Sequence, residues 1–125
     1  MTGRNLAGRR VLVVEDEFFI ADDLAKALSA LGAEVVGPVP AVAEALRVVA
    51  DERLDLAVLD INLRGVPVFP VADALRAKNV PFVFATGYAD TAIPAAYASV
   101  PRWEKPYRED DLARALGGTG PAPDD

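Results

Sequence analysis

The chain has 125 residues, of which 52% are hydrophobic and 26% charged, and it carries a formal net charge of −6 with neither Cys nor His. A chain of this length is expected to form one domain with a buried core. The lack of Cys and His excludes disulfides, thiolate or imidazole metal sites, Ser-His triads and a phosphohistidine of its own, so a metal site must use oxygen ligands. The acidic balance argues against nucleic acid as a partner. Since no apolar run reaches the roughly 20 residues of a membrane span and no signal peptide is recognisable, we expect a cytoplasmic protein without membrane attachment.

The first half of the chain alternates short apolar runs with stretches whose apolar residues recur at the helical period. Two runs without a polar residue, 11–14 and 56–59, predict strands buried on both faces, and 34–37 predicts a shorter one. Between these runs, 17–31 and 42–53 predict helices with one apolar face.

The second half continues the alternation. A loop rich in Gly and Pro, 64–70, leads into a helix that Pro70 suits, because the N–H that proline lacks is not needed in a first turn. Residues 82–85 predict a fourth strand and 100–104 a very short fifth strand. Residues 108–116 predict a last helix, with acids at the end where the helix dipole favours them.

The two ends of the chain are poor in apolar residues. Residues 1–8 predict a flexible N-terminal arm and 118–125 a disordered tail, which leaves 9–117 as the folded domain. Because parallel strands need crossover connections, five strands that alternate with helices predict an α/β domain with one parallel sheet.

Polar side chains follow four of the five predicted strands. In strand order they are Glu15 and Asp16, Asp60 and Asn62, Thr86, and Lys105. The residues that follow parallel strands meet at one edge of the sheet, where ligands bind in such folds. If the strand order is 2-1-3-4-5, the four polar strand ends are neighbours.

This set of side chains suits a phosphoryl group. The like charges of Glu15, Asp16 and Asp60 are costly together unless a divalent cation such as Mg²⁺ compensates them. Asp60 is a carboxylate nucleophile of the aspartyl-phosphate type, Thr86 offers a hydrogen bond, and Lys105 offers a positive charge. Each residue alone has an ordinary explanation as a helix-dipole acid, a turn former or a surface lysine. Their joint occurrence at one sheet edge favours the functional interpretation.

Four motifs resemble the receiver domain of two-component response regulators, over roughly residues 9–117. They are VLVVEDE (11–17), LAVLDINL (56–63), FATGY (84–88) and EKPY (104–107). The resemblance implies a doubly wound, flavodoxin-like sheet of five parallel strands in the order 2-1-3-4-5.

The resemblance also implies a role for each site residue. Asp60 would be the phosphorylated aspartate, with Glu15 and Asp16 as further Mg²⁺ ligands and Asn62 contributing its backbone carbonyl. Thr86 matches the switch hydroxyl and Lys105 the lysine that pairs with the phosphoryl group. The Lys105–Pro106 peptide resembles a cis bond of the family.

More narrowly, PFVFATGY (81–88) is similar to the signature of single-domain "FAT GUY" receivers. Thr86 and Lys105 are only 19 positions apart and Pro94 lies between them, so the fourth helix should be short or distorted. The position three before the lysine, where receivers usually carry an aromatic switch residue, holds Arg102. Tyr88 is the candidate replacement, and we expect Trp103 to be at least partly buried.

The sequence therefore predicts a stand-alone receiver. A histidine kinase or histidine phosphotransferase would phosphorylate Asp60, and the signal would pass to an unknown downstream protein, or the chain would act as a phosphate shuttle or sink. Two alternatives remain open at this point: a small Mg²⁺-dependent phosphatase, and a pseudo-receiver that binds a partner without being phosphorylated. The complete set of site residues speaks against the pseudo-receiver.

Overall fold

A computed structural model describes residues 6–87 and 93–117. Its centre is one parallel sheet of five strands in the order β2-β1-β3-β6-β7. The strands are β1 (Arg10–Val14), β2 (Glu34–Val39), β3 (Leu56–Asp60), β6 (Phe82–Thr86) and β7 (Arg102–Glu104). Numbered along the chain within this sheet, that order is 2-1-3-4-5, so the predicted fold class is confirmed.

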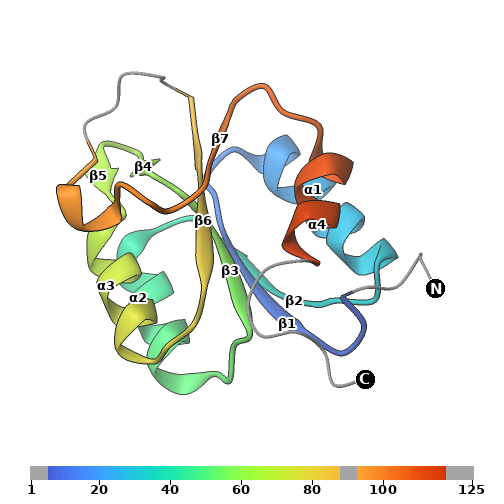
Figure 1. Cartoon of the computed structure of the whole chain (residues 1–125), viewed down its shortest axis with the longest axis horizontal. Helices are drawn as coiled ribbons and strands as arrows, with labels where there is room; N and C mark the ends of the chain where they lie inside the picture. Colours follow the sequence, from blue (N-terminus) through green and yellow to red (C-terminus); the bar gives the residue numbers. More distant parts are fainter. Residues whose placement is uncertain (1–5, 88–92, 118–125) are drawn as a thin grey trace.

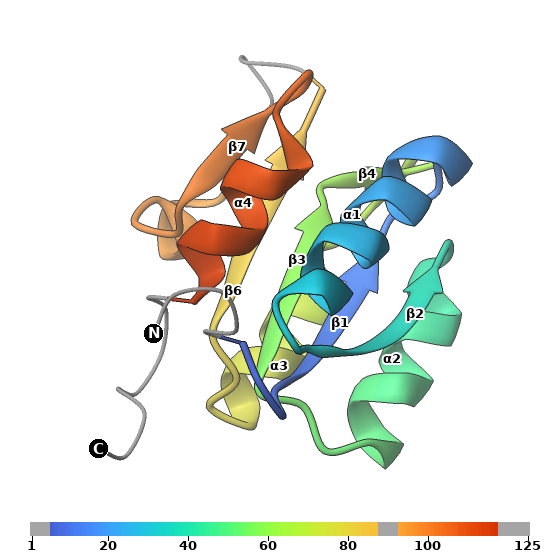
Figure 2. The same ribbon diagram turned by 90° about the vertical axis from the view of Figure 1, so that its right-hand side faces the viewer.

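Helices cover both faces of the sheet (Figures 1 and 2). On one face, α1 (Phe18–Ala30) packs beside α4 (Glu109–Leu116), and on the other, α2 (Val42–Asp51) packs beside α3 (Phe69–Ala77). The sheet is thus doubly wound, as its parallel strands require.

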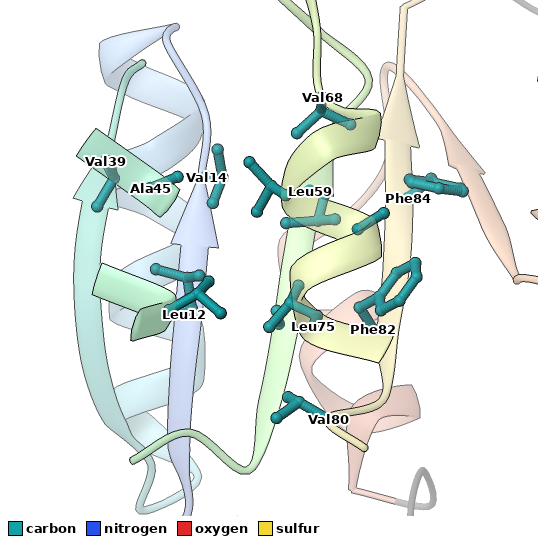
Figure 3. Packing of buried hydrophobic residues seen from close by; sticks show 14 of the residues in the cluster. Leu12, Val14, Val39, Ala45, Leu59, Val68, Leu75, Val80, Phe82 and Phe84 are labelled. Carbon is teal, nitrogen blue, oxygen red and sulfur yellow. The ribbon is translucent and has the colours of Figure 1, made fainter. Parts of the chain in front are cut away.

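The side chains of successive residues in each strand point to opposite faces of the sheet. Val11 and Val13 of β1 pack with residues of α1 and α4. Leu12 and Val14 pack with residues of α2 and α3, the side that Figure 3 shows. The strands in the middle of the sheet are therefore buried on both faces, as their unbroken apolar runs predict.

The edge strand β2 extends two residues beyond its predicted end at Gly37. Its pairing with β1 shifts register between Leu12 and Val14, so that Val39 reaches a place beside Val14. Gly37 makes this possible with a φ of 99°, and a Cβ there would lie 2.9 Å from the Val39 nitrogen. The extension ends where the Val39 carbonyl accepts a hydrogen bond from the Glu15 N–H at 3.0 Å.

The predicted loop 64–70 contains part of a small hairpin, formed by β4 (Asn62–Leu63) and β5 (Val66–Pro67). Arg64 and Gly65 connect the two strands with φ values of 53° and 86°. Positive φ at both central residues is what a tight antiparallel connection needs. The hairpin lies directly after β3 and so forms one wall of the region beyond the strand ends.

A single 3-10 turn, η1 (Ala95–Tyr97), is the only helical element between β6 and β7 in the described part of the chain. This turn stands where the sequence predicts a short or distorted fourth helix, before the last strand, so that prediction is confirmed. Pro94 precedes the turn and does not interrupt it. Tyr97 fixes the turn to α3. Its ring stacks on Phe69 at 5.9 Å, and its hydroxyl donates a hydrogen bond to the Asp73 carboxylate.

The packed domain begins before the predicted boundary at residue 9. Leu6 is fully buried in the cluster under α1 and α4, and its N–H donates to the Leu31 carbonyl at 3.1 Å. An isolated leucine in a polar segment gives no periodic signal, so the sequence could not reveal this contact. The rest of the predicted arm, 1–5, and the predicted tail, 118–125, lie outside the described residues. None of the helices described here is long and apolar enough to cross a membrane.

Candidate functional site

The carboxyl ends of the strands border a cavity of about 540 Å³. Its walls come from the start of α1, the β4–β5 hairpin and the segments that follow β3, β6 and β7. The lining residues are Asp16, Glu17, Ile20, Asp60, Asn62, Arg64, Gly65, Thr86, Gly87, Lys105 and Pro106. The structure therefore brings together the strand ends that the sequence singles out.

Three carboxylates form a cluster at this edge. One oxygen each of Glu15, Asp16 and Asp60 lies within 4.8 Å of the others. Glu15 and Asp60 are almost completely buried, with 4% and 5% of their surface exposed, whereas Asp16 is partly exposed. Such a group of oxygens at this spacing suits a hard divalent cation.

Backbone N–H groups orient each carboxylate of the cluster. The N–H of Glu17 donates to Glu15 Oε2 at 3.1 Å, and the N–H of Asn62 donates to Asp60 Oδ1 at 3.2 Å. The N–H of Arg64, at the tip of the hairpin, donates to Asp16 Oδ2 at 3.1 Å. These donors come from the main chain, so the positions of the carboxylates are set by the fold.

Lys105 pairs with the acids of the site. Its Nζ lies 3.0 Å from Glu15 Oε1, 3.0 Å from Glu17 Oε1 and 3.1 Å from Asp60 Oδ2, and its side chain is 12% exposed. Burial alone would lower the pKa of Lys105. The hydrogen bond that Lys105 donates to Glu15 and the charge of Asp60 outweigh burial and raise that pKa above its ordinary value, so the ammonium is firmly protonated.

Glu15 shows how unfavourable the crowding of acids is. Burial, followed by the negative charge of Asp60, raises the pKa of Glu15 from 4.5 to about 7, against the opposing effect of Lys105. One ammonium therefore compensates only part of the negative charge that the fold gathers here. A bound divalent cation would remove the rest of this cost.

Thr86 ends β6 inside the site. It is 2% exposed, and its carbonyl accepts a hydrogen bond from the Lys105 N–H at 2.7 Å, which joins the ends of β6 and β7. The Lys105–Pro106 peptide is cis, as the resemblance implies. Trp103 is partly buried against the cluster under α1 and α4, as expected. The candidate switch residue Tyr88 lies outside the described residues.

Asn62 holds the hairpin with its side chain. Its amide oxygen accepts a hydrogen bond from the Gly65 N–H at 2.7 Å. Its neighbour across the two strands is Pro67, which has no N–H to offer the Asn62 carbonyl. That carbonyl is the group which the resemblance to receivers implies as a metal ligand.

Six lining residues were not among the predicted site residues, and two of them, Glu17 and Arg64, make long-range contacts with predicted ones. Glu17 reads in the sequence as one more acid at the start of a helix, yet its carboxylate contacts Lys105. Arg64 lies in a segment predicted to be loop, and its N–H donates to Asp16. Both contacts join residues at least 48 positions apart, so no local pattern could have indicated them.

Comparison with known proteins points to one family. The family model described as the response regulator receiver domain matches residues 11–116. The solution structure of SdrG from Sphingomonas melonis Fr1 is 43% identical, with a TM-score of 0.76, and the match covers 90% of this chain and 94% of that one. The BeF3-activated conformation of SdrG, attributed to Pseudomonas melonis Fr1, is 44% identical with a TM-score of 0.72, over 88% of this chain and 94% of that one.

Among curated proteins, the sensory transduction protein LytT of Bacillus cereus is 33% identical over 111 residues, which are 86% of this chain and 45% of LytT. The chain spans about half the length of the curated relatives it matches. The matched region contains every strand of the sheet except the first residue of β1. The chain belongs to the response regulator receiver domain family and is a phosphoacceptor signalling module.

Proposed function

We propose that Asp60 accepts a phosphoryl group from a phosphohistidine protein, either a histidine kinase or a histidine phosphotransferase. The observation that carries this proposal is the position of Asp60. Asp60 is the last residue of the central strand β3 and lines the cavity, and its carboxylate lies 3.1 Å from the Lys105 ammonium, within the acidic cluster. The family membership of the chain implies a histidine kinase as partner.

The acidic cluster fits Mg²⁺. Glu15, Asp16 and Asp60 would hold the ion, with the Asn62 carbonyl as a further ligand and water in the remaining positions. Burial, and then the charge of Asp60, raises the pKa of Glu15 and so disfavours its ionised form, which a bound divalent cation would favour. When bound, the ion would screen the negative charges of the carboxylates and of the incoming phosphoryl oxygens.

The side chains of Asp60, Lys105 and Thr86 would each take one role in the transfer. An oxygen of Asp60 attacks phosphorus while the N–P bond of phosphohistidine breaks and the imidazole leaves. Lys105, already beside Asp60, pairs with one phosphoryl oxygen, and the Thr86 hydroxyl donates a hydrogen bond to another. In-line transfer of this kind needs positioning and charge neutralisation more than covalent help.

A stand-alone role of the FAT GUY type is the finer part of the proposal. The FATGY motif and the short η1 turn, the only helical element described between β6 and β7, support it. The match to almost the whole of SdrG supports it as well. In this proposal Thr86 moves toward the phosphoryl group and Tyr88 changes its position, which alters a surface that a downstream protein reads. Such a chain signals by protein contact, or shuttles or stores phosphoryl groups.

The decisive experiment is incubation with phosphorylated histidine kinases and Mg²⁺, followed by detection of acid-labile label. Asp60→Asn removes the nucleophile and keeps the shape, so label should vanish. Asp51→Asn, at the carboxyl end of α2, is the matched control and should keep full labelling. Label retained on Asp60→Asn would refute the proposal.

The same preparation separates the alternatives. A small phosphatase would turn over low-molecular-weight phosphoesters many times, and a pseudo-receiver would take no label from any donor. Transfer to Asp60 from a phosphohistidine protein without such turnover is the expected result.

A further inference from the structure

Glu17 stands at the start of α1 but does not cap the helix. It is the N-cap residue of α1, yet its side chain makes no capping hydrogen bond. Ser, Thr, Asp or Asn would cap the helix there, whereas the longer side chain of Glu is poorly suited to do so. The carboxylate of Glu17 instead turns toward the cavity and contacts Lys105 Nζ at 3.0 Å.

The three acids that share Lys105 differ in what else they do. Asp60 is the candidate nucleophile, and Glu15 belongs with it to the carboxylate cluster. Glu17 lies outside that cluster, and its side chain is 61% exposed. It is thus the partner of Lys105 that solvent reaches at the mouth of the cavity, and the one that neither the metal site nor the nucleophile requires.

We infer that Glu17 is a positioning residue that restrains Lys105 in the unphosphorylated protein and competes with the phosphoryl group for it. The inference rests on the proposed function, since it assumes that Lys105 pairs with a phosphoryl oxygen on Asp60. To form that pair, the ammonium must give up some of its present contacts with Glu15, Glu17 and Asp60. Each contact with Glu17 opposes this exchange, and the charge of Glu17 also repels an anion that enters the cavity.

As a consequence, Glu17 makes the phosphorylated state less stable, relative to the unphosphorylated state, than Asp60, Lys105 and Thr86 alone would make it. An ion pair with one exposed partner contributes little, and its loss should change an equilibrium by about two- to fivefold. Glu17 therefore adjusts the site and is not essential to it.

The experiment compares the full chain with Glu17→Gln in binding of beryllofluoride, a phosphoryl mimic, at saturating Mg²⁺, followed by NMR. Glu17→Gln should bind the mimic about two- to fivefold more tightly. Asp23→Asn, an exposed acid on the same helix that does not line the cavity, removes the same charge and should leave binding unchanged. Thermal unfolding of both variants checks that the fold is intact.

A second measurement needs neither metal nor mimic. In the metal-free protein, the NMR signals of the Lys105 side chain should shift in Glu17→Gln and stay in place in Asp23→Asn, because Glu17 contacts the ammonium and Asp23 is not among its ion-pair partners. Equal or weaker binding of the mimic by Glu17→Gln, or unshifted Lys105 signals, would overturn the inference. If the unsubstituted chain takes no label and binds no beryllofluoride, the proposed function fails instead.

Discussion

The buried carboxyl of Glu15 should make the metal-free protein less stable as pH rises from about 5 to 8. Burial, and then the charge of Asp60, raises the pKa of Glu15 to about 7 in the folded protein, against 4.5 for an ordinary glutamate. Between these two pH values the folded state holds a proton that the unfolded state has released. Its contribution to stability is therefore complete below about 4.5 and is lost as pH rises through about 7.

The size of the effect follows from the separation of the two pKa values. Each pKa unit of separation corresponds to about 1.4 kcal/mol, so the interval from 4.5 to about 7 sets a ceiling of about 3.5 kcal/mol. Glu15 shares its environment with Asp60 and Lys105, so part of the effect is distributed over the cluster. We expect a loss of about 1–3 kcal/mol in the free energy of unfolding.

The assay is urea denaturation in metal-free buffer at several pH values between 5 and 8. In Glu15→Gln the side chain cannot ionise, so the decline should largely disappear, and the variant should be the more stable protein at pH 8. If Mg²⁺ is held by the ionised carboxylates as proposed, it should restore the stability of the unsubstituted chain at that pH. Parallel pH profiles of the two proteins would show that Glu15 does not carry the effect and would refute the reasoning.

Four further substitutions test the packing of the fold. Gly37→Ala should lower the free energy of unfolding by at least about 2 kcal/mol, because it combines a positive φ with a Cβ 2.9 Å from a backbone nitrogen. Gly65→Ala is also at positive φ but faces open space, so it should lower the free energy of unfolding by about 1 kcal/mol in the same denaturation assay. Equal costs would mean that the close approach at Gly37 does not matter. Tyr107→Phe should raise the midpoint of thermal unfolding or leave it unchanged, since the buried Tyr107 hydroxyl has no hydrogen-bond partner among the residues described. Tyr97→Phe should lower it by the equivalent of about 1–2 kcal/mol, because that hydroxyl donates to the Asp73 carboxylate, and a matching change in both variants would contradict the assignment.

The order of elements could be predicted because the strands in the middle of the sheet are buried on both faces, which leaves unbroken apolar runs in the sequence. The end of β2 and the start of the packed domain could not be predicted from the sequence. Val39 joins β2 through a register shift against β1, and Leu6 packs under α1 and α4, and both are contacts between distant segments. The shortness of the helical element between β6 and β7 was predictable from the spacing of Thr86 and Lys105, but its attachment through Tyr97 was not.

The cluster of Glu15, Asp16 and Asp60 was predictable for a different reason. Topology alone brings the ends of parallel strands together, so a residue count after each strand is enough to find them. The partner set of Lys105 was not predictable, because it depends on which way the Glu17 side chain turns at the start of α1. The roles of these residues in phosphoryl transfer remain predictions until the labelling experiment is done.

The division of apolar residues between the two sides of the sheet has a consequence for how substitutions combine. Leu28 packs with α4, and Leu75 packs on the opposite side of the sheet, so the two share no cluster. Free-energy changes at well-separated sites without common partners add, whereas those at neighbouring sites do not. The side that packs α1 and α4 can therefore diverge in sequence independently of the side that packs α2 and α3. The phosphoacceptor edge, built on strand ends that both sides support, would stay in place while either surface adapts to a new partner.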